Sequence, residues 1–263
     1  MLLADKNAVI YGAAGAIGAT VARAFAAEGA TVFLTGRNAA ALDTVAKEIT
    51  ASGGTAHTAV VDATDEDAVE NHVGMVAAQA GSLDISFNAI AVPQEGIQGT
   101  PLAELTVERF VLPVHTYMTS HFLTTRAAAR RMIPQRSGVI LTLTATPARL
   151  AAPLTGGMAP AWAGIEALTR ALSAELGPHG VRALCLRPDA IPETATIDVV
   201  FGQHAKTAGV TREQFTAMMA GLTHRKHFPT LAEVASAAVF AASDRAAAIT
   251  GTVLNLSGGS ITD

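Results

Sequence analysis

Short runs rich in β-branched residues alternate with amphipathic segments along almost the whole chain of 263 residues. The expected strands lie at residues 7–11, 31–35, 57–61, 84–88, 138–143, 181–186 and 252–256. Helical periodicity fills the intervals at residues 16–28, 39–51, 65–80, 107–132, 160–176 and 231–242. Seven strands joined by helical crossovers predict an α/β fold built on a doubly wound parallel sheet, with each crossover right-handed.

The composition agrees with a sheet that is buried on both faces. Half of the residues are hydrophobic and only 15% are charged, a ratio typical of a parallel sheet covered by helices. The length suits one large domain, and no linker or internal repeat divides residues 1–263. One connection, at about residues 189–230, is too long for an ordinary loop, and we expect it to form a lid over a substrate site.

Charge and cysteine content exclude several classes of protein. A net charge of −4 argues against binding to nucleic acid or a membrane surface, because basic patches supply that affinity. No apolar stretch approaches the roughly 20 residues needed to cross a bilayer, and the first residues do not resemble an export signal. The single cysteine, Cys185, lies in an apolar run and is predicted to be a buried core residue. These features together predict a cytoplasmic protein.

Two helix ends carry clear signals. Thr64 is placed to cap the helix at 65–80, whose first residues Asp65, Glu66 and Asp67 suit the positive end of a helix dipole. Gly29 stands where a left-handed residue would end the first helix.

The first expected strand runs directly into a glycine-rich turn and a helix, in "IYGAAGAIGATVARAF". Glycines recur at Gly12, Gly15 and Gly18, with Ala16 and Ile17 between the last two. This spacing permits a tight turn and lets backbone N–H groups approach a pyrophosphate, whose charge a helix N-terminus stabilises. A strand, this turn and a helix in succession predict a dinucleotide-binding site.

The end of the second expected strand, "FLTGRN", indicates which nicotinamide dinucleotide would bind. A site for NAD usually carries an acidic residue here for the ribose hydroxyls. The chain instead has Gly36, which leaves room, and Arg37, whose guanidinium suits a 2′-phosphate. The sequence therefore favours NADP(H). Asp62, at the end of the third strand, either accepts from the adenine amino group or caps the helix that follows it.

With these stretches in place, the sequence resembles the short-chain dehydrogenase/reductase (SDR) superfamily along essentially its whole length. The matching stretches are "YGAAGAIG", "LTGRN", "VVDATDED", "LDISFNAIA", "HFLTTRAAARRM", "LTRALSAELGPHGVRALCLRP" and "ASDRAAAITGTVLNLSGG". The resemblance implies a single Rossmann-type domain with strand order 3-2-1-4-5-6-7, and it places Asn88 and Pro188 beside the cofactor. Two departures are minor: Ala16 replaces the family's middle glycine, and "NAIA" at 88–91 replaces Asn-Asn-Ala-Gly.

A larger departure concerns the four residues with which the family usually works, Asn, Ser and Tyr-x-x-x-Lys. Counted from the flanking matches, their positions fall on His115, Ala145, Met158 and Trp162. In the family the tyrosine exchanges a proton with the substrate oxygen, while the lysine lowers its pKa and holds the nicotinamide ribose. Met158 and Trp162 can do neither, so the resemblance implies an atypical member without the ordinary carbonyl-reducing machinery.

The residues that remain near these positions have two interpretations each. His115 can transfer a proton near neutral pH, or it is a helix histidine satisfied by the backbone. The hydroxyls of Thr144 and Thr146 flank Ala145 and can bind a substrate oxygen, or they belong to ordinary β-formers. Asp189 can orient a cationic substrate or cap a turn.

Met158 and Trp162 are predicted to form a pocket wall that suits a flat apolar or aromatic substrate, with the indole face open to a cation. Pro160 is expected to keep Met158 just before the helix proper. Neither Tyr11 nor Tyr117 is expected to take the place of Met158 without moving an element. No Cys, His or carboxylate cluster has metal-ligand spacing, so we expect no metal.

Three hypotheses follow. The chain is an NADPH-dependent reductase of an activated C=N or C=C, which needs no protein acid at oxygen; or it oxidises and reduces alcohols and carbonyls with His115 as the proton-transfer group. Alternatively it is a non-redox enzyme or an inactive NADP(H)-binding module on the same scaffold. The helices at 107–132 and 160–176, which often pair in the family, predict a homo-oligomer, either a dimer or a tetramer.

Overall fold

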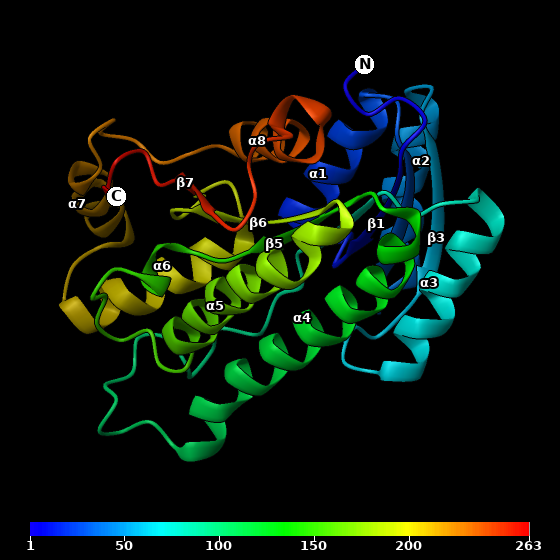
Figure 1. Cartoon of the computed structure of the whole chain (residues 1–263). Helices are drawn as coiled ribbons and strands as arrows, with labels where there is room; N and C mark the ends of the chain where they lie inside the picture. The colour runs from blue at the N-terminus through cyan, green and yellow to red at the C-terminus, as the bar shows by residue number, and fades with distance from the viewer. Residues whose placement is uncertain (263) are drawn as a thin grey trace.

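The computed structural model (Figure 1) describes residues 1–262 as one layer of sheet between two layers of helices. All seven strands are parallel, in the order β3-β2-β1-β4-β5-β6-β7, which confirms the predicted sheet. The strands are β1 (Asn7–Tyr11), β2 (Thr31–Gly36), β3 (Thr55–Val60), β4 (Ile85–Asn88), β5 (Gly138–Leu143), β6 (Val181–Pro188) and β7 (Val253–Leu256).

In the part of the chain that the structure describes, eight α-helices connect the strands. They are α1 (Ala16–Ala27), α2 (Ala39–Ala51), α3 (Glu66–Ala80), α4 (Val107–Gln135), α5 (Met158–Leu176), α6 (Ala195–Ala208), α7 (Arg212–Leu222) and α8 (Leu231–Ala242). The order of strands reverses between β1 and β4, which pair in register from Ala8 with Ile85 to Tyr11 with Asn88. A ligand of an open α/β sheet binds beyond the strand ends at such a switch point.

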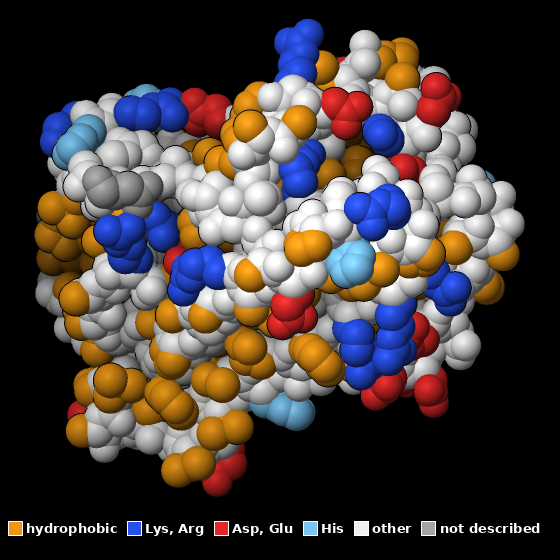
Figure 2. Space-filling view, in the orientation of Figure 1, with side chains coloured by type: hydrophobic (Ala, Val, Ile, Leu, Met, Phe, Trp, Pro, Cys, Tyr) orange, Lys and Arg blue, Asp and Glu red, His pale blue; other side chains and the backbone are white. Residues whose placement is uncertain are grey.

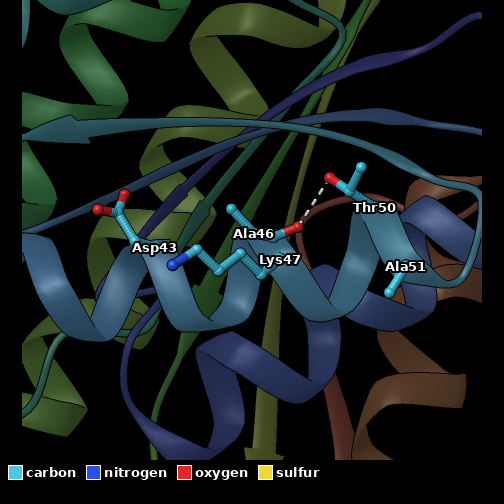
Figure 3. Close-up of a pocket in the computed structure, with 5 residues that line it drawn as sticks. All are labelled: Asp43, Ala46, Lys47, Thr50 and Ala51. Carbon is cyan, nitrogen blue, oxygen red and sulfur yellow. Dashed lines mark hydrogen bonds between the residues drawn. The ribbon is translucent and has the colours of Figure 1, made fainter.

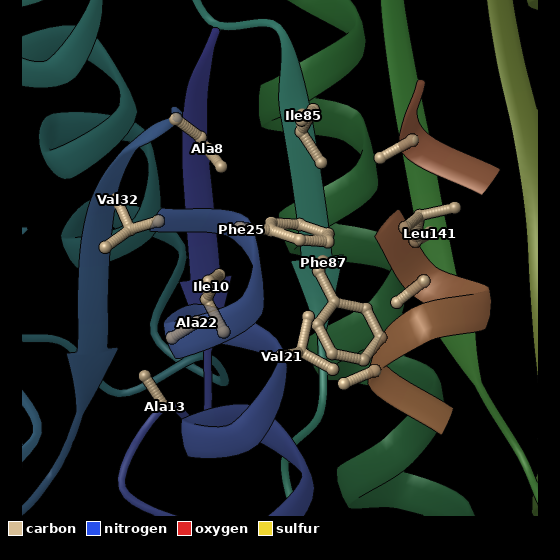
Figure 4. Close-up of a cluster of buried hydrophobic side chains, with 14 of the residues drawn as sticks. Ala8, Ile10, Ala13, Val21, Ala22, Phe25, Val32, Ile85, Phe87 and Leu141 are labelled. Atoms are coloured by element: carbon tan, nitrogen blue, oxygen red, sulfur yellow. The ribbon is translucent and has the colours of Figure 1, made fainter. Parts of the chain in front are cut away.

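Each face of the sheet has its own hydrophobic core. On one face, α1, α2 and α8 cover residues of β1, β2 and β4, and Figure 4 shows the Phe25 ring of α1 between Ile85 and Phe87 of the sheet. On the other face, α3, α4 and the end of α5 cover Val9, Phe33 and their neighbours. Burial on both faces explains why the strands read as nearly continuous apolar runs.

The ends of the first and third helices test the expected caps. Gly29 has φ +94°, so the left-handed residue after α1 is confirmed. The cap of α3 is Asp65, whose side chain accepts from the backbone N–H of Ala68 at 3.0 Å. The expectation for Thr64 was therefore wrong by one residue. Thr64 instead donates its backbone N–H and its hydroxyl to Asp62.

The start of α5 also differs from the expectation, because Met158 is the first residue of the helix and does not precede it. Pro160 is the third helical residue, and residues in the first turn have no helical acceptor for their N–H groups. A proline there removes no hydrogen bond, so the helix can begin two residues before it.

The predicted lid at residues 189–230 contains two helices, α6 and α7, which the sequence did not indicate. Their apolar side chains form a separate cluster of Val200, Phe201, Ala205 and Phe215, together with Phe228, which follows α7. The Phe201 ring contacts those of Phe215 and Phe228 at centroid distances of 5.3 and 5.6 Å. The segment is thus a small helical layer with its own core beside the sheet.

The surface has two features of note. Figure 2 shows hydrophobic side chains gathered before and along the start of α4, where Leu102, Val107, Val111 and Leu112 are exposed. Figure 3 shows a shallow hollow on the outer side of α2, lined by Asp43, Ala46, Lys47, Thr50 and Ala51. None of these residues belongs to the expected site. Within residues 1–262, no helix is both long and apolar enough to span a bilayer.

Candidate active site

The glycine-rich turn between β1 and α1 is packed so closely that side chains would not fit. Gly12 has φ +72°, and a Cβ there would lie 2.6 Å from the carbonyl oxygen of Ala89. A Cβ on Gly18 would overlap the backbone of Gly12. Gly15, in contrast, is exposed and begins α1 without a side-chain cap. The turn is held by its own backbone and leaves the first N–H groups of α1 open to a ligand.

Arg37 and Asp62 lie near each other beyond the ends of β2 and β3. The Asp62 side chain accepts from the Thr64 hydroxyl at 2.7 Å and from the Thr64 backbone N–H at 2.9 Å. These hydrogen bonds, together with the nearby charge of Arg37, hold the pKa of Asp62 below its ordinary value. Both side chains are exposed, so the pair can still receive the adenosine end of a dinucleotide.

Asn88 ends β4 and is 2% exposed. Its amide donates to the Thr124 hydroxyl of α4 at 3.1 Å, and its Oδ1 accepts from the backbone N–H of Ile90. The side chain thereby fixes the loop after β4, which contacts Gly12. Pro188 is the last residue of β6, at the same edge of the sheet.

A third side chain lies beside Met158 and Trp162, the two residues that were predicted to form a pocket wall. Met158 is fully buried and Trp162 half-buried, and both belong to a cluster that includes Val92 and Tyr117. The Tyr117 ring, from α4, lies 6.3 Å from the Trp162 ring between centroids, at an interplanar angle of 41°. Tyr117 does not replace Met158, yet it brings a phenol to the same corner without moving any element.

The phenol of Tyr117 lies close to the Trp162 side chain and to Val92. Burial raises the pKa of Tyr117 to about 12, and these polar neighbours oppose that rise. The site therefore keeps a proton-bearing group close to residues 158 and 162.

Helical spacing could have revealed Tyr117 in the sequence. Tyr117, His121, Thr124 and Ala128 recur at intervals of four, three and four, and all four are buried on the inner side of α4. His115 is off this stripe and exposed. Assigning the site residue by its distance along the sequence from flanking motifs does not consider which face of α4 is buried.

The two glycines before α5 explain how α4 and α5 approach so closely. Gly156 has φ +53°, which few residues other than glycine adopt. A Cβ on Gly157 would overlap the carbonyl group of Phe110 in α4. The start of α5 therefore lies against the backbone of α4, which places Met158 and Trp162 beside Tyr117.

Thr144 lies beneath the site in a buried polar group. Its hydroxyl donates to Glu166 at 3.2 Å and lies 3.3 Å from the sulfur of Cys185. Glu166 also pairs with Arg187 at 3.2 Å, although Arg187 is only 1% exposed. Cys185 is buried as predicted, and burial raises the pKa of its thiol to about 11. The sequence analysis did not single out Glu166 or Arg187.

Ala145 follows β5 and offers no hydroxyl, whereas the next residue, Thr146, donates to Asp189 at 3.2 Å. Asp189 also accepts from the Ser260 hydroxyl at 2.5 Å and from the backbone N–H of Ala190 at 2.8 Å. Of the two interpretations given above, its contacts are those of a turn cap. Within residues 1–262, no three Cys, His or carboxylate side chains are grouped to hold a metal ion.

The lid is attached to the site through a chain of buried amides. Gln94 donates to the carbonyl of Val92 at 2.6 Å, and Gln98 donates to Gln94 at 2.7 Å. His204 of α6 lies 3.2 Å from the Gln98 oxygen, and its ring lies 5.7 Å from that of Phe215. Because the Gln98 oxygen can only accept, Nε2 of His204 carries the hydrogen.

Comparison with known proteins agrees with this geometry. A family model described as enoyl-(acyl carrier protein) reductase matches residues 12–260. The gluconate 5-dehydrogenase of Gluconobacter oxydans (strain 621H) is 31% identical over 260 residues, which cover 98% of this chain and 95% of that protein. The chain therefore belongs to this family of short-chain dehydrogenases/reductases, and it is an SDR-family oxidoreductase.

Solved structures share the whole architecture. The structure of NAD+-bound xylitol dehydrogenase has a TM-score of 0.92 at 23% identity, covering 98% of this chain and all of that one. A variant of actinorhodin polyketide ketoreductase with NADPH has a TM-score of 0.89 at 25% identity and covers 97% of both chains. Structural neighbours thus hold either dinucleotide, and the family acts on small molecules.

Proposed function

We propose that this protein is an NADP(H)-dependent oxidoreductase that acts on a small apolar or aromatic molecule. The observation that carries the proposal is the turn between β1 and α1, in which close packing at Gly12 and Gly18 leaves an uncapped helix end. No acidic side chain lies in the first turn of α1, so nothing repels a pyrophosphate there. When bound, the nicotinamide supplies or accepts a hydride.

Each cofactor contact falls to residues that are placed for it. The backbone N–H groups of Ala16, Ile17 and Gly18 would bind the pyrophosphate, while Asn88 and Pro188 would border the nicotinamide end. Arg37 would pair with a 2′-phosphate, and Asp62 beside it would accept from the adenine amino group. The preference for NADP(H) over NAD rests on Arg37 and on the absence of an acid at the end of β2.

The substrate would lie against Met158 and Trp162. Because residues 145 and 158 carry no exchangeable proton, we keep two kinds of acceptor. An activated C=N or C=C needs no protein acid at oxygen, whereas a carbonyl needs a proton from another group, for which the sequence nominates His115, with Thr144 as a hydroxyl donor. His115 is exposed, and the Thr144 hydroxyl is bonded to Glu166. Both observations favour a hydride acceptor that needs no proton from the protein, or a proton donor other than these two residues.

The cofactor is tested by the only tryptophan, Trp162, whose fluorescence should be quenched by a bound nicotinamide. Arg37→Ser should raise the Kd for NADPH by about 10- to 100-fold, since hydrogen bonds to charged groups contribute about 1.5–3 kcal/mol. The Kd for NADH should stay unchanged. Arg23→Ser, which removes an arginine paired with Glu48 on α2, is the matched control. Equal affinities of the wild type for NADH and NADPH would contradict the preference.

The reaction is tested by NADPH oxidation with a panel of imines, enones and ketones. His115→Phe should abolish ketone reduction if His115 transfers the proton, and it should change little otherwise. Tight binding of NADPH without oxidation by any member of the panel would instead favour the non-redox alternative, which the replaced residues at 145, 158 and 162 keep open. The cytoplasmic location and the homo-oligomer remain predictions, the second checked by light scattering.

A further inference from the structure

A second pocket lies at the edge of the sheet opposite the dinucleotide turn, and the proposed function makes no use of it. Its open space is about 360 Å³, near the lower end of the usual range for small-molecule sites. Residues at the starts of four neighbouring strands, β1, β4, β5 and β6, line it together with residues from the end of α8 onward. The glycine-rich turn follows the other end of β1, so the two sites are separate.

The pocket has an apolar floor and a polar rim. Ile85, Val139 and Val181 lie within the first two residues of their strands and are at most 8% exposed. The charged side chains around them are half-buried or exposed. Gly177 brings no side chain to the rim, and a Cβ there would meet no atom within 4 Å. The pocket therefore offers an apolar surface to one part of a ligand and charged groups to another.

The cationic side chains of the pocket are Arg182 and Lys6. Nη1 of Arg182 donates to the carbonyls of Ala241 and Ile249 at 2.9 and 3.3 Å, and Nη2 donates to that of Ser243 at 3.0 Å. Of the five N–H groups of a guanidinium, those on Nε and one on Nη2 are left within residues 1–262, and such neighbouring donors suit a carboxylate. Nζ of Lys6 has no hydrogen bond or ion pair with any described residue.

The anionic side chains of the pocket are Asp84 and Asp244. Asp84 already accepts from the backbone N–H of Asn7 at 2.9 Å and from the Ser82 hydroxyl at 2.8 Å. The carboxylate of Asp244 is exposed and, among the described residues, has no hydrogen bond or ion pair. Neither carboxylate pairs with either cation within residues 1–262. The four charges thus balance without touching, and a ligand with one charge of each sign would complete them.

We propose that this pocket is a second small-molecule site, which binds an aliphatic α-amino acid as its zwitterion. The carboxylate would pair with Arg182 and Lys6, and the ammonium would pair with Asp244. The aliphatic side chain would lie on the apolar floor. A simple carboxylate would leave Asp244 without a partner, and a simple amine would add a third positive charge to the pocket. The inference goes beyond the proposed function and does not depend on it.

Analogues of one amino acid test whether both charges are needed. Isothermal titration calorimetry with the full chain should show saturable binding of at least one of L-leucine, L-isoleucine and L-valine. For L-leucine, the N-acetyl derivative lacks the ammonium, and 3-methylbutylamine lacks the carboxylate. Each should bind more weakly by about tenfold or more, because a hydrogen-bonded charge pair is lost. Equal affinity for either analogue would overturn the inference, as would the absence of binding by all three amino acids.

Single substitutions locate the ligand. Lys6→Gln and Asp244→Asn each remove one charge from a side chain that has no partner among the described residues. Each should weaken amino acid binding by about three- to tenfold, the usual range for one hydrogen bond in water. Lys47→Gln, which changes a lysine of the hollow on α2, is the matched control and should bind as the wild type does. Wild-type affinity in both Lys6→Gln and Asp244→Asn would overturn the site.

These measurements need no turnover, so a wild type that oxidises no NADPH would contradict the proposed function and leave this inference intact. The Kd for NADPH should stay unchanged in Lys6→Gln and Asp244→Asn, because the two sites lie at opposite edges of the sheet. An equal loss of NADPH affinity in these variants would indicate a general defect of the fold and overturn the assignment of a separate site.

Discussion

The stability of this protein should fall in mild acid because two histidines are buried in neutral form. His121 of α4 is 1% exposed, and Nδ1 of its ring lies 2.9 Å from the carbonyl oxygen of Tyr117, while its Nε2 has no partner. His72 of α3 is 4% exposed. Burial lowers the pKa of each to about 4, from an ordinary value of 6.5.

The sign follows from the number of bound protons. Between pH 6.5 and 4, the unfolded chain binds protons at these histidines and the folded chain does not, so the free energy of unfolding decreases as the pH falls. For pKa values of 6.5 and 4, the loss at pH 5 is about 2 kcal/mol per histidine, or about 4 kcal/mol for the pair. Total stabilities of about 5–15 kcal/mol make this a large effect.

Urea unfolding at pH 8, 6.5 and 5 measures the slope. His121→Asn, whose amide can still donate to the Tyr117 carbonyl, should remove about half of the loss between pH 8 and 5, and adding His72→Leu should remove most of the rest. The quantity to compare is the change in the free energy of unfolding between pH 8 and pH 5, since either substitution can also alter stability at pH 8. A free energy of unfolding that stays constant from pH 8 to 5 would refute the reasoning, as would an unchanged slope in both variants.

Three further predictions concern the site. Gly18→Ala should weaken NADPH binding by about 5- to 150-fold, because overpacking costs about 1–3 kcal/mol. Gly221→Ala, at a helical glycine with open space around it, should leave binding unchanged; fluorescence titration measures both. Glu166→Gln should lower the free energy of unfolding by about 1–3 kcal/mol, because it removes the charge of a carboxylate that accepts from the buried Arg187, and urea unfolding at pH 8 would detect it. His204→Phe should raise the substrate KM about three- to tenfold by removing one hydrogen bond to the lid while leaving the Kd for NADPH unchanged, as steady-state kinetics would show.

Much of the fold could be predicted from the sequence because apolar periodicity is a local signal. The strands at 7–11 and 138–143 and the helices at 39–51 and 231–242 have the predicted bounds. The errors have three kinds. The sequence did not indicate α6 and α7, and the third strand is Thr55–Val60 where residues 57–61 were predicted. At helix starts, Asp65 rather than Thr64 is the cap, and Pro160 is accommodated inside the first turn of α5. Threonine and aspartate are both favoured as N-caps, so the sequence does not show which of two neighbouring residues begins the helix.

The candidate site was less predictable because its contacts join distant segments. The phenol of Tyr117 reaches Trp162 only because Gly157 lets the two helices touch. The ion pair of Glu166 and Arg187 joins α5 to β6. Each residue lies alone in an apolar stretch, and nothing in the sequence indicates that the two charges pair. Local patterns locate elements, but they do not show which side chains meet across them.

The buried residues around Met158 and Tyr117 form a cluster of their own, separate from the two clusters that hold the sheet. Substitutions among them can therefore change chemistry at little expense to the architecture. A descendant of this chain could exchange one proton donor for another, or lose it altogether, and still fold into the same seven strands. Similarity of the backbone then still indicates common ancestry, although it no longer indicates which reaction the protein catalyses.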